Sequence, residues 1–318
     1  MYDVITLGSA TIDVFPVISK KLHDVKLGEK VLVDKIAFET GGGGVNSAAG
    51  LSRMGLKTAF LGKLGHDHNA FKILHELKKE KVSVIKTDAS EYPTSYSVIM
   101  NSSLERDRII FTYKGASDHL RYSEIKKSSL NTKWMYMATM LGESLKTCKK
   151  LAKFASKNNI KIMFNPSTYL AKKGKLALRP ILNATTILVL NKEEAKLLLK
   201  TKKNYIPYLL QELRRLGPKV VVVTEGNKGV AVFDGTNIYS MKAYDVKVMS
   251  TAGAGDAFAS GFLAGILHKK DIAHALELGM ANASSVVQYF GTKNKLLTYR
   301  QALKFISKRK ENVLMRKL

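Results

Sequence analysis

The chain has 318 residues, enough for one large α/β domain or two smaller ones, and 45% of them are hydrophobic, as in ordinary globular proteins. Its single cysteine, Cys148, excludes an intramolecular disulfide and is typical of a reducing compartment. The first residues predict a strand and lack the basic and apolar runs of a signal peptide, and no apolar run reaches the ~20 residues that span a membrane. We therefore expect a soluble, cytoplasmic protein without a membrane partner.

The formal charge of +26 raises the question of nucleic-acid binding. Most lysines are scattered as pairs along predicted helices, and only the segment from Lys308 to Lys317 is clustered. No aromatic residues interleave with that segment, as a stacking platform for bases would require. The favoured interpretation is a solvated, lysine-rich surface whose field attracts anionic nucleotides, so a nucleic-acid partner is not expected. A non-catalytic nucleotide- or RNA-binding protein stays open as a less favoured alternative.

Apolar runs alternate with helical patterns along most of the chain. Strands are expected at 3–7, 58–61, 133–138, 161–164, 186–190, 219–224 and 230–233. Helices are expected at 46–54, 69–79, 145–157, 192–199, 207–216, 255–268, 271–289 and 299–308. Several strands are apolar without alternation, which is typical of strands buried on both faces of a parallel sheet. The order predicts an α/β fold with a doubly wound, mainly parallel sheet flanked by helices.

Two segments, about 11–38 and 94–113, are extended and contain no predicted helix. The polar residues 101–103 separate two strands of a plausible hairpin. A small sheet outside the βα units is a natural lid over a site. We expect a single domain over residues 1–318 with this β lid. The free edges of such a lid make a homodimer through the lid a candidate assembly.

The most informative motif is Ser250 to Phe258, STAGAGDAF, followed by a helical pattern. Its glycines allow a tight turn and close approach to a ligand, and the start of a helix attracts an anion. Asp256 then places a carboxylate beside the anion pocket. Because phosphoryl transfer to a hydroxyl needs an anion cradle next to a base, the motif predicts a small-molecule kinase.

A second glycine cluster, Gly41 to Gly44, leads into Asn46 and a helix, without the Gly-Lys-Ser/Thr of a Walker loop. The segments Gly8 to Asp13, Gly41 to Asn46, Leu61 to Asp67 and Thr251 to Asp256 occur in that order and together resemble the ribokinase family of carbohydrate and nucleoside kinases. The resemblance extends over nearly the whole chain. It implies a parallel-sheet core with a β lid and an ATP-dependent, Mg²⁺-requiring sugar kinase. A nucleoside kinase of the same fold is the alternative, because lid aromatics such as Phe15, Phe38, Tyr96 and Phe111 can hold a base.

The resemblance also implies roles for individual residues. Asp256 matches the catalytic base, and the amides around Gly253, Ala254 and Gly255 match the anion hole for the moving phosphoryl group. The implied nucleotide-binding residues are Asn191, Glu194, Thr224, Gly226, Gly229, Thr251 and Asn282. Among them Glu194 is expected to hold Mg²⁺ through water, and Asn282 to line the adenine pocket. The residues alone also allow a helix cap at Asn191 and Glu194 and a hairpin turn from Thr224 to Gly229.

On the acceptor side the resemblance implies substrate contacts from Thr11, Asp13, Gly41, Gly42 and Asn46. Glu143 is a further candidate for a hydroxyl contact. Lys114 on the lid strand can meet a carboxylate or phosphate on the acceptor, although a solvated lysine is the favoured interpretation there. The family commonly has Asp where this chain has Ser250, which puts activation by a monovalent cation in doubt. The choice between ATP and ADP as donor, and the identity of the acceptor, stay open.

Overall fold

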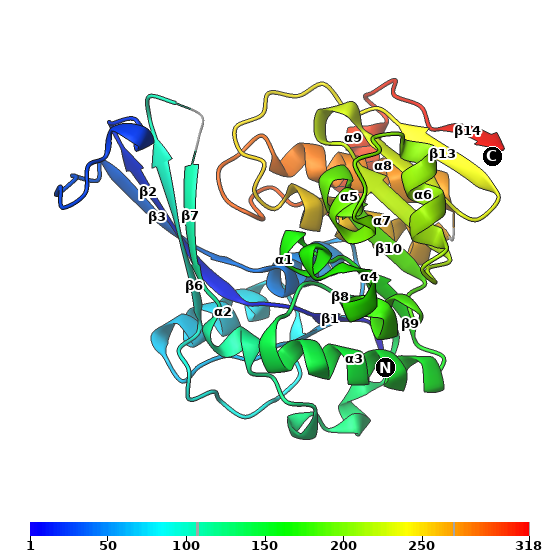
Figure 1. Ribbon diagram of the computed structural model, residues 1–318, viewed down its shortest axis with the longest axis horizontal. Coiled ribbons are helices and arrows are strands. Elements are labelled where there is room, and N and C mark those ends of the chain that lie inside the picture. Colours follow the sequence, from blue (N-terminus) through cyan, green and yellow to red (C-terminus); the bar gives the residue numbers. More distant parts are fainter. Residues whose placement is uncertain (106–107, 270, 318) are drawn as a thin grey trace.

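The computed structural model describes residues 1–105, 108–269 and 271–317, and within these ranges the strands form a ten-stranded sheet and a four-stranded sheet. The large sheet has the order β14 (Leu314–Lys317), β13 (Asn237–Met241), β12 (Val230–Phe233), β11 (Val220–Thr224), β10 (Ile187–Asn191), β9 (Lys161–Phe164), β8 (Thr132–Met137), β1 (Tyr2–Leu7), β4 (Thr58–Leu61) and β5 (Ser83–Val84). The small sheet has the order β3 (Lys35–Gly41), β2 (Thr11–Ile18), β6 (Ser95–Ser102) and β7 (Arg108–Tyr113). It projects away from the body of the protein (Figure 1).

The strands of the large sheet run parallel from β11 to β5, and β12, β13 and β14 are antiparallel additions at one edge. The strand order reverses between β1 and β8, because β4 and β5 lie outward from β1 while β9, β10 and β11 lie outward from β8. In open α/β sheets a ligand crevice forms at the carboxyl ends of the strands beside such a reversal. The topology therefore places the site near Ser9, after β1, and Ala138, after β8.

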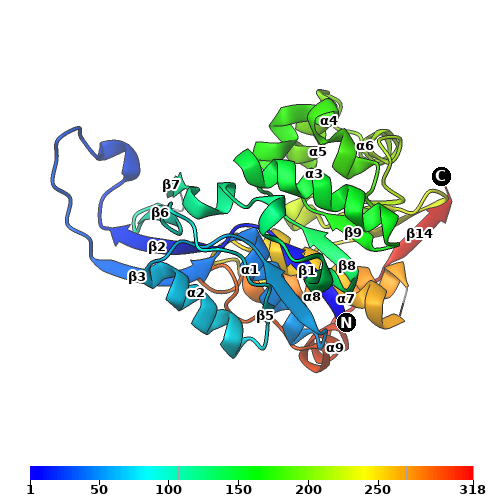
Figure 2. The same ribbon diagram turned by 90° about the horizontal axis from the view of Figure 1, so that it is seen from below.

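Helices cover both faces of the large sheet (Figure 2). They are α1 (Gly43–Arg53), α2 (His68–Lys79), α3 (Gly142–Lys157), α4 (Thr168–Leu182), α5 (Lys192–Leu199), α6 (Ile206–Arg214), α7 (Ala254–Lys269), α8 (Ile272–Val286) and α9 (Tyr299–Ile306). The helices α3 to α6 share one apolar core with the sheet, whereas α1, α7, α8 and α9 share the core on the other face. Burial on both faces explains why the central strands carry no polar alternation.

Helix α7 is the central helix of its layer and packs at close range against both neighbours. At the crossing with α1, a Cβ added to Gly50 would lie 2.3 Å from the Ser260 hydroxyl oxygen. At the crossing with α8, a Cβ on Gly265 would lie 2.4 Å from the Cα of Ala275. Small residues on these faces therefore set how near the three helix axes come, and they bring the first turns of α1 and α7 together.

One face of the lid sheet is apolar, and the other carries a polar row near the cavity, with Phe15 and Ile99 two residues further out on that same face. Cross-strand partners on the polar face are Glu39, Asp13, Ser97 and Thr112, in the order β3, β2, β6, β7. The next row, on the opposite face, is Phe38, Val14, Val98 and Phe111. Near its base the apolar face packs on α2, but further out Phe38 and Phe111 are 51% and 60% exposed. The lid thus presents polar groups to the body and uncovered aromatic rings to solvent.

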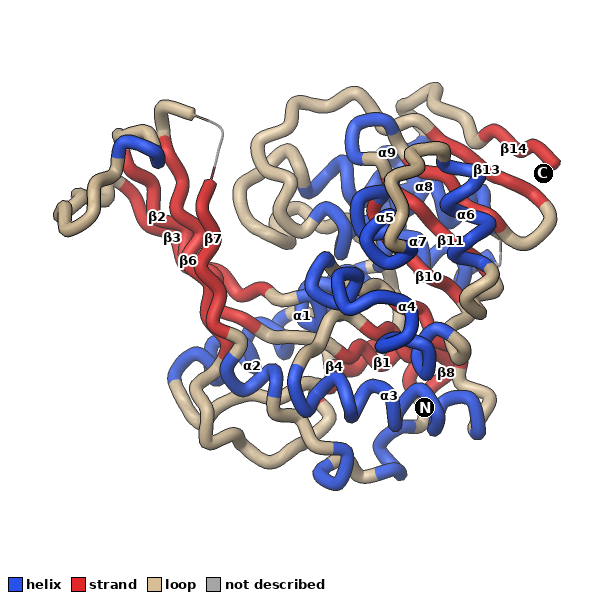
Figure 3. The backbone as a smooth tube through the Cα atoms, viewed as in Figure 1, coloured by secondary structure: helices blue, strands red, loops and turns tan. Residues whose placement is uncertain are grey.

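The fold predicted from the sequence is confirmed: a large, mainly parallel sheet with helices on both faces and a small separate β sheet (Figure 3). Helix α4 was not predicted, since Gly174 with φ 79° kinks it and Pro180 lies inside it. The edge strands β13 and β14 were also missed, because both are short and β14 is exposed throughout. The expected turn at 101–103 is shifted, since Asn101 and Ser102 still belong to β6. Among the described helices, none is long and apolar enough to cross a membrane.

We predict that Gly265→Ala lowers the free energy of unfolding by about 1–3 kcal/mol, because the new methyl group must displace the α8 backbone. The intrinsic gain of about 1 kcal/mol for replacing a helical glycine by alanine is too small to offset this clash. Urea unfolding followed by circular dichroism measures the change. Gln211→Ala, on the exposed face of α6, is the matched control and should stay within about 0.5 kcal/mol of the parent. A Gly265→Ala protein at least as stable as the parent would contradict the close-packing argument.

Candidate active site

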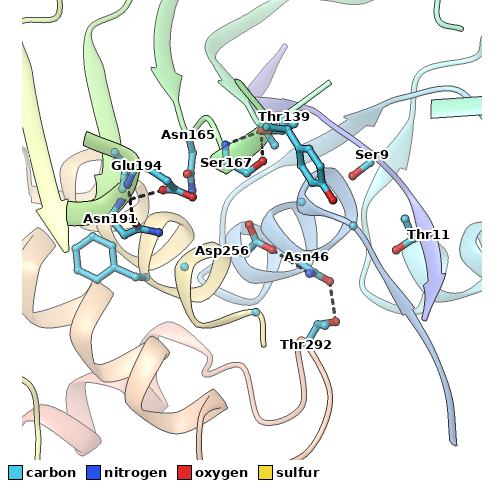
Figure 4. A pocket seen from close by; sticks show the side chains of 18 of the residues that line it. Ser9, Thr11, Asn46, Thr139, Asn165, Ser167, Asn191, Glu194, Asp256 and Thr292 are labelled. Carbon is cyan, nitrogen blue, oxygen red and sulfur yellow. Dashed lines mark hydrogen bonds between the residues drawn. The ribbon is translucent and has the colours of Figure 1, made fainter. Parts of the chain in front are cut away.

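A cavity of about 380 Å³ lies at the carboxyl ends of β1, β8, β9, β10 and β11 and is closed on one side by the lid (Figure 4). Each of these strands supplies a side chain just beyond its last residues or at its end. They are Ser9 after β1, Thr139 after β8, Asn165 after β9, Asn191 of β10 and Thr224 of β11. The strand-order reversal therefore coincides with the cavity, as the topology requires.

Asp256 lies in the first turn of α7 and faces the cavity beside the start of α1. The side-chain amide of Asn46 donates a hydrogen bond of 2.9 Å to Asp256 Oδ2. The hydroxyl of Thr292 lies 3.2 Å from Asn46 Oδ1 and donates to it. Because Thr292 occupies the amide oxygen, the amide NH₂ is directed to the carboxylate. Residues 210 positions apart thus form one hydrogen-bonded unit that holds the carboxylate in place.

Burial raises the pKa of Asp256 to about 6, and the nearby carboxylates of Asp13 and Glu194 add to the rise. The hydrogen bond from Asn46 acts in the opposite direction and lowers the pKa. A carboxylate with a pKa near 6 is a better proton acceptor than an ordinary aspartate and is still ionised at neutral pH. The arrangement suits a general base.

The turn before α7 brings the backbone against the cavity. Gly253 has φ +76°, and a Cβ there would lie 1.8 Å from the carbonyl oxygen of Thr292, so only glycine fits. Gly253 and Gly255 line the cavity, and Ala254 lines an adjoining one. The first N–H groups of a helix have no partner within the helix, and the helix dipole favours negative charge there. The residues 253–255 can therefore bind an anionic phosphoryl group next to Asp256.

The lid side of the cavity is lined by Thr11, Asp13, Gly42, Ser97 and Thr112. The Thr11 hydroxyl donates a 2.9 Å hydrogen bond to Asp13 Oδ1. Burial raises the pKa of Asp13, and hydrogen bonds from Thr11 and Ser97 partly oppose the rise. Gly41 does not line the cavity but lies against Asp13, since a Cβ there would be 1.8 Å from Asp13 Oδ2. A carboxylate and several hydroxyls on one wall can bind a polyhydroxylated molecule.

Asn191 and Glu194 form a capping box at the start of α5. The Asn191 side chain accepts from the Glu194 N–H at 2.8 Å, and Glu194 Oε2 accepts from the Asn191 N–H at 3.0 Å. Both side chains nevertheless line the cavity, so the structural and the functional interpretation hold together. Burial raises the pKa of Glu194, and its carboxylate has no cationic partner among the described residues. An oxygen ligand of this kind fits a hydrated Mg²⁺ ion held through water.

A second cavity of about 770 Å³ adjoins the first, and Thr224, Gly255 and Phe258 line both. Its walls are mostly apolar, with a glycine-rich edge. They include Gly226, Gly229, Tyr244, Val246, Val248, Thr251, Ala254, Met280, Ala283, Ser284 and Val287. The size and apolar lining suit an aromatic base with its ribose, placed so that attached phosphates reach Gly255.

Three of the residues expected in the site do not line either cavity: Gly41, which lies against Asp13 as described above, and Asn282 and Glu143. Asn282 is fully buried and makes structural hydrogen bonds, donating to the Ala257 carbonyl at 2.8 Å and accepting from the Leu297 N–H at 2.9 Å. The face of α8 that lines the second cavity carries residues 280, 283, 284 and 287 instead. Glu143 lies in the first turn of α3, away from the cavity lining, and pairs with Lys146 at 2.8 Å on the surface.

Several lining residues were missed from the sequence. They are Ser9, Ser97, Thr112, Thr139, Asn165, Ser167, Tyr169 and Thr292. The strand ends gave a usable signal for Thr139 and Asn165, since small polar residues follow apolar strands there. No local signal marks Thr292, which reaches the site only because the chain returns to it after α8. Ser250, expected to weaken a cation site, accepts a hydrogen bond from the Ala252 N–H at 3.2 Å.

Comparison with known proteins links this geometry to a function. Residues 1–298 match the family described as pfkB family carbohydrate kinase. The ribokinase of Bacillus subtilis is 26% identical over 311 residues, 96% of this chain and 100% of that protein. A 5-dehydro-2-deoxygluconokinase of Clostridium botulinum is 27% identical over 327 residues, 98% of this chain and 94% of that protein. The crystal structure of a nucleoside kinase from Methanocaldococcus jannaschii is similar in fold, with TM-score 0.81, 24% identity and coverage of 97% of this chain and 99% of that one.

We predict that kcat/KM falls about tenfold per pH unit below pH 6, because the base must be unprotonated and the pKa of Asp256 is about 6. Asn46→Leu should move this acidic limb to higher pH, since the hydrogen bond that lowers the pKa of Asp256 is lost. Initial rates of ADP release between pH 4.5 and 9 give both profiles.

The exposed Asn183→Leu variant serves as the control and should keep the parent profile. An acidic limb centred near pH 4, unchanged in Asn46→Leu, would contradict the assigned environment of Asp256.

Proposed function

The chain belongs to the pfkB family of carbohydrate kinases, and on that premise we propose that it transfers the γ-phosphoryl group of ATP to an alcohol hydroxyl of a sugar or sugar derivative, with Asp256 as the base. The observation that carries the proposal is that Asp13 and Asp256 line one cavity, which adjoins a larger apolar cavity across Gly255. One cavity suits the acceptor and the other the donor nucleoside.

The proposed reaction is an in-line displacement between the two cavities. Asp13, Thr11 and Asn46 hold the acceptor with one hydroxyl at Asp256. The hydroxyl oxygen attacks the γ-phosphorus while the bond to the bridging oxygen of ADP breaks, and the proton passes to Asp256. The N–H groups of Gly253 and Gly255 stabilise the charge on the moving group, while the N–H of Ala254 donates to the Thr251 carbonyl at 3.3 Å. Positioning of the two substrates supplies most of the rate, because an aspartate is a weak base for an alcohol.

In this proposal Asn191 and Glu194 hold Mg²⁺ through water at the phosphates. Bound there with the nucleotide, the ion neutralises charge on the phosphate oxygens. Thr224, Gly226, Gly229 and Thr251 contact the phosphates and ribose from the edge of the second cavity. A reducing cytoplasm, where ATP and magnesium are abundant, is the location that fits the single, fully buried thiol of Cys148.

The lining of the first cavity favours a sugar over a nucleoside as acceptor. The lid aromatics Phe15, Phe38, Tyr96 and Phe111 do not belong to that lining, and the two aromatic rings that do, Tyr169 and Phe258, come from α4 and α7. Phe38 and Phe111 lie on the opposite face of the lid. The wall instead carries the hydroxyls and carboxylate that a polyol needs. The clostridial relative is named for a sugar acid, and the Bacillus relative for ribose.

We further propose that the apolar lid face forms a homodimer with the same face of a second copy, while residues 1–318 act as one catalytic unit. Ile36, Phe38, Ile109, Phe111 and Tyr113 lie on that face and are each more than two-fifths exposed. Contiguous exposed apolar groups of this kind mark association surfaces. A two-fold dimer buries the patch on both copies at once.

Asp256→Asn should reduce kcat at least about 100-fold, the lower range for loss of a positioned base, while ATP affinity stays near that of the parent. Coupled ADP-release assays and nucleotide titration measure the two effects. Glu143→Gln makes the same carboxylate-to-amide change outside the cavity and should change kcat less than twofold. Near-parental turnover by Asp256→Asn would refute its assignment as the base.

Phe111→Arg should convert the dimer to a monomer, because a charge at the centre of the apolar lid face cannot be desolvated. Light scattering coupled to gel filtration gives the mass of each form. Phe290→Arg is the control, since Phe290 is 61% exposed and lies outside the lid. If the parent protein is monomeric at micromolar concentration, the lid dimer is wrong.

A further inference from the structure

Lys114 is the one cation among the described residues that line the first cavity, alongside the carboxylates of Asp13, Glu194 and Asp256. It follows β7 directly and begins the 3-10 turn Gly115–Asp118. The sequence favoured a solvated lid lysine at this position. The structure instead shows a half-buried side chain, and burial lowers the pKa of its ammonium group.

The backbone of Lys114 is fixed on both sides. Its carbonyl oxygen accepts hydrogen bonds from the Ser95 hydroxyl and, at 3.1 Å, from the Ser117 N–H. Ser95 is the first residue of β6, so these bonds tie the end of the lid hairpin to its start. The side chain therefore leaves from a rigid part of the lid and needs little ordering to bind a ligand.

The ammonium group has no acceptor in the described part of the protein. No hydrogen bond or ion pair joins Lys114 Nζ to a described residue, and the ammonium makes a cation–π contact with the ring of Tyr169, whose centroid is 5.0 Å away. Asp118 and Asp13 attract it electrostatically without forming an ion pair. A half-buried ammonium that lines a cavity and lacks an oxygen partner is a binding site for an anionic or oxygen-rich ligand.

Lys114 lies on the acceptor side of the cavity and not beside the residues expected to bind the nucleotide phosphates. Its electrostatic neighbour in the cavity is Asp13, which belongs to the acceptor wall. The residues set out for the nucleotide phosphates, Asn191, Glu194 and Gly255, belong to the core strands and to α7. The aromatic partner, Tyr169, comes from the first turn of α4 and also lines the cavity.

We propose that Lys114, with Tyr169 beside it, binds an anionic group on the acceptor, a carboxylate or a phosphate, at the end of the molecule away from the hydroxyl that is phosphorylated. This inference rests on the proposed kinase function and narrows it from sugars in general to sugar acids or sugar phosphates. The three carboxylates of the cavity repel such an acceptor unless a cation is placed for it, and Lys114 supplies that cation. The excess of basic residues over the whole chain draws both anionic substrates to the site.

The test uses the full-length protein and pairs of acceptors that share a carbon chain and differ in the anionic group. One arm pairs four- to six-carbon sugar acids with the corresponding alditols, and the other pairs sugar phosphates with the free sugars. ADP release gives kcat and KM for each. The parent enzyme should prefer one anionic series over its neutral counterparts by at least about tenfold in kcat/KM, the effect of one charge-assisted hydrogen bond.

Lys114→Met keeps an unbranched side chain one atom shorter and removes its charge. It should lower kcat/KM for the preferred anionic acceptor about 10- to 100-fold, mainly through KM, with a much smaller loss for the neutral partner. Lys114→Arg should restore most of the preference, which separates lost charge from lost folding. Lys173→Met is the matched control, because Lys173 also acts electrostatically on Asp118 but is exposed and outside the cavity lining.

The outcomes separate this inference from the function on which it rests. Phosphorylation of neutral sugars or nucleosides with no preference for either anionic series overturns the role of Lys114 and leaves the kinase proposal standing. An equal fall in kcat/KM for anionic and neutral acceptors in Lys114→Met also overturns the role of Lys114. A parent enzyme that phosphorylates no alcohol overturns both. A fall in kcat/KM of Lys114→Met for sugar acids, but not for alditols, identifies the anionic group as a carboxylate. A fall for sugar phosphates, but not for free sugars, identifies it as a phosphate.

Discussion

The close crossing of α1 and α7 is the constraint on which the rest of the structure depends. Gly50 and Ser260 meet at the crossing, and only a missing side chain lets the two helices approach so closely. Their first turns then lie together, so that Asn46 of α1 reaches the carboxylate of Asp256 in α7. A glycine with positive φ precedes each helix, Gly42 before α1 and Gly253 before α7, and both line the cavity. If the axes of α1 and α7 moved apart by the width of a methyl group, Asp256 would lose its hydrogen bond from Asn46. The proposed anion site at the start of α7 would then no longer lie against α1.

Two structurally different parts of the protein line the cavity, the packed core and the lid. The donor side is built from strand ends and helix starts that are packed on both faces by the core. The acceptor side is built from the lid, whose strands β3 and β7 are largely exposed. The two sides are coupled electrostatically, since the carboxylates of Asp13 and Glu194 both raise the pKa of Asp256. In the functions proposed above, Lys114 at the end of β7 and a hydrated Mg²⁺ ion at the nucleotide phosphates supply positive charge to these carboxylates from opposite sides of the cavity.

Much of this arrangement could be predicted from the sequence, and the exceptions have physical causes. Apolar strands, glycine-rich turns and helix starts leave local patterns, so the core, the lid and the segment around Asp256 were found. Helix α4 was missed because Gly174 and Pro180 interrupt its pattern: Gly174 is non-helical and kinks the helix, whereas Pro180 is accommodated inside it. Asn282 was placed in the site because it lies in the right helix, but its side chain points to the opposite face and holds α7. The position of Thr292 depends on long-range packing, which no local pattern encodes.

The separate construction of the lid has a consequence for how such an enzyme changes over evolutionary time. Substitutions on the polar lid face alter what is recognised but remove little buried apolar area, so their effect on folding is small. Substitutions around α7 affect a helix buried on all sides and are strongly constrained. A lineage can therefore acquire new acceptors while its phosphoryl-transfer apparatus stays fixed. With the role proposed for Lys114, a change of charge at this one position, where the lid joins the core, would redirect the enzyme between anionic and neutral acceptors.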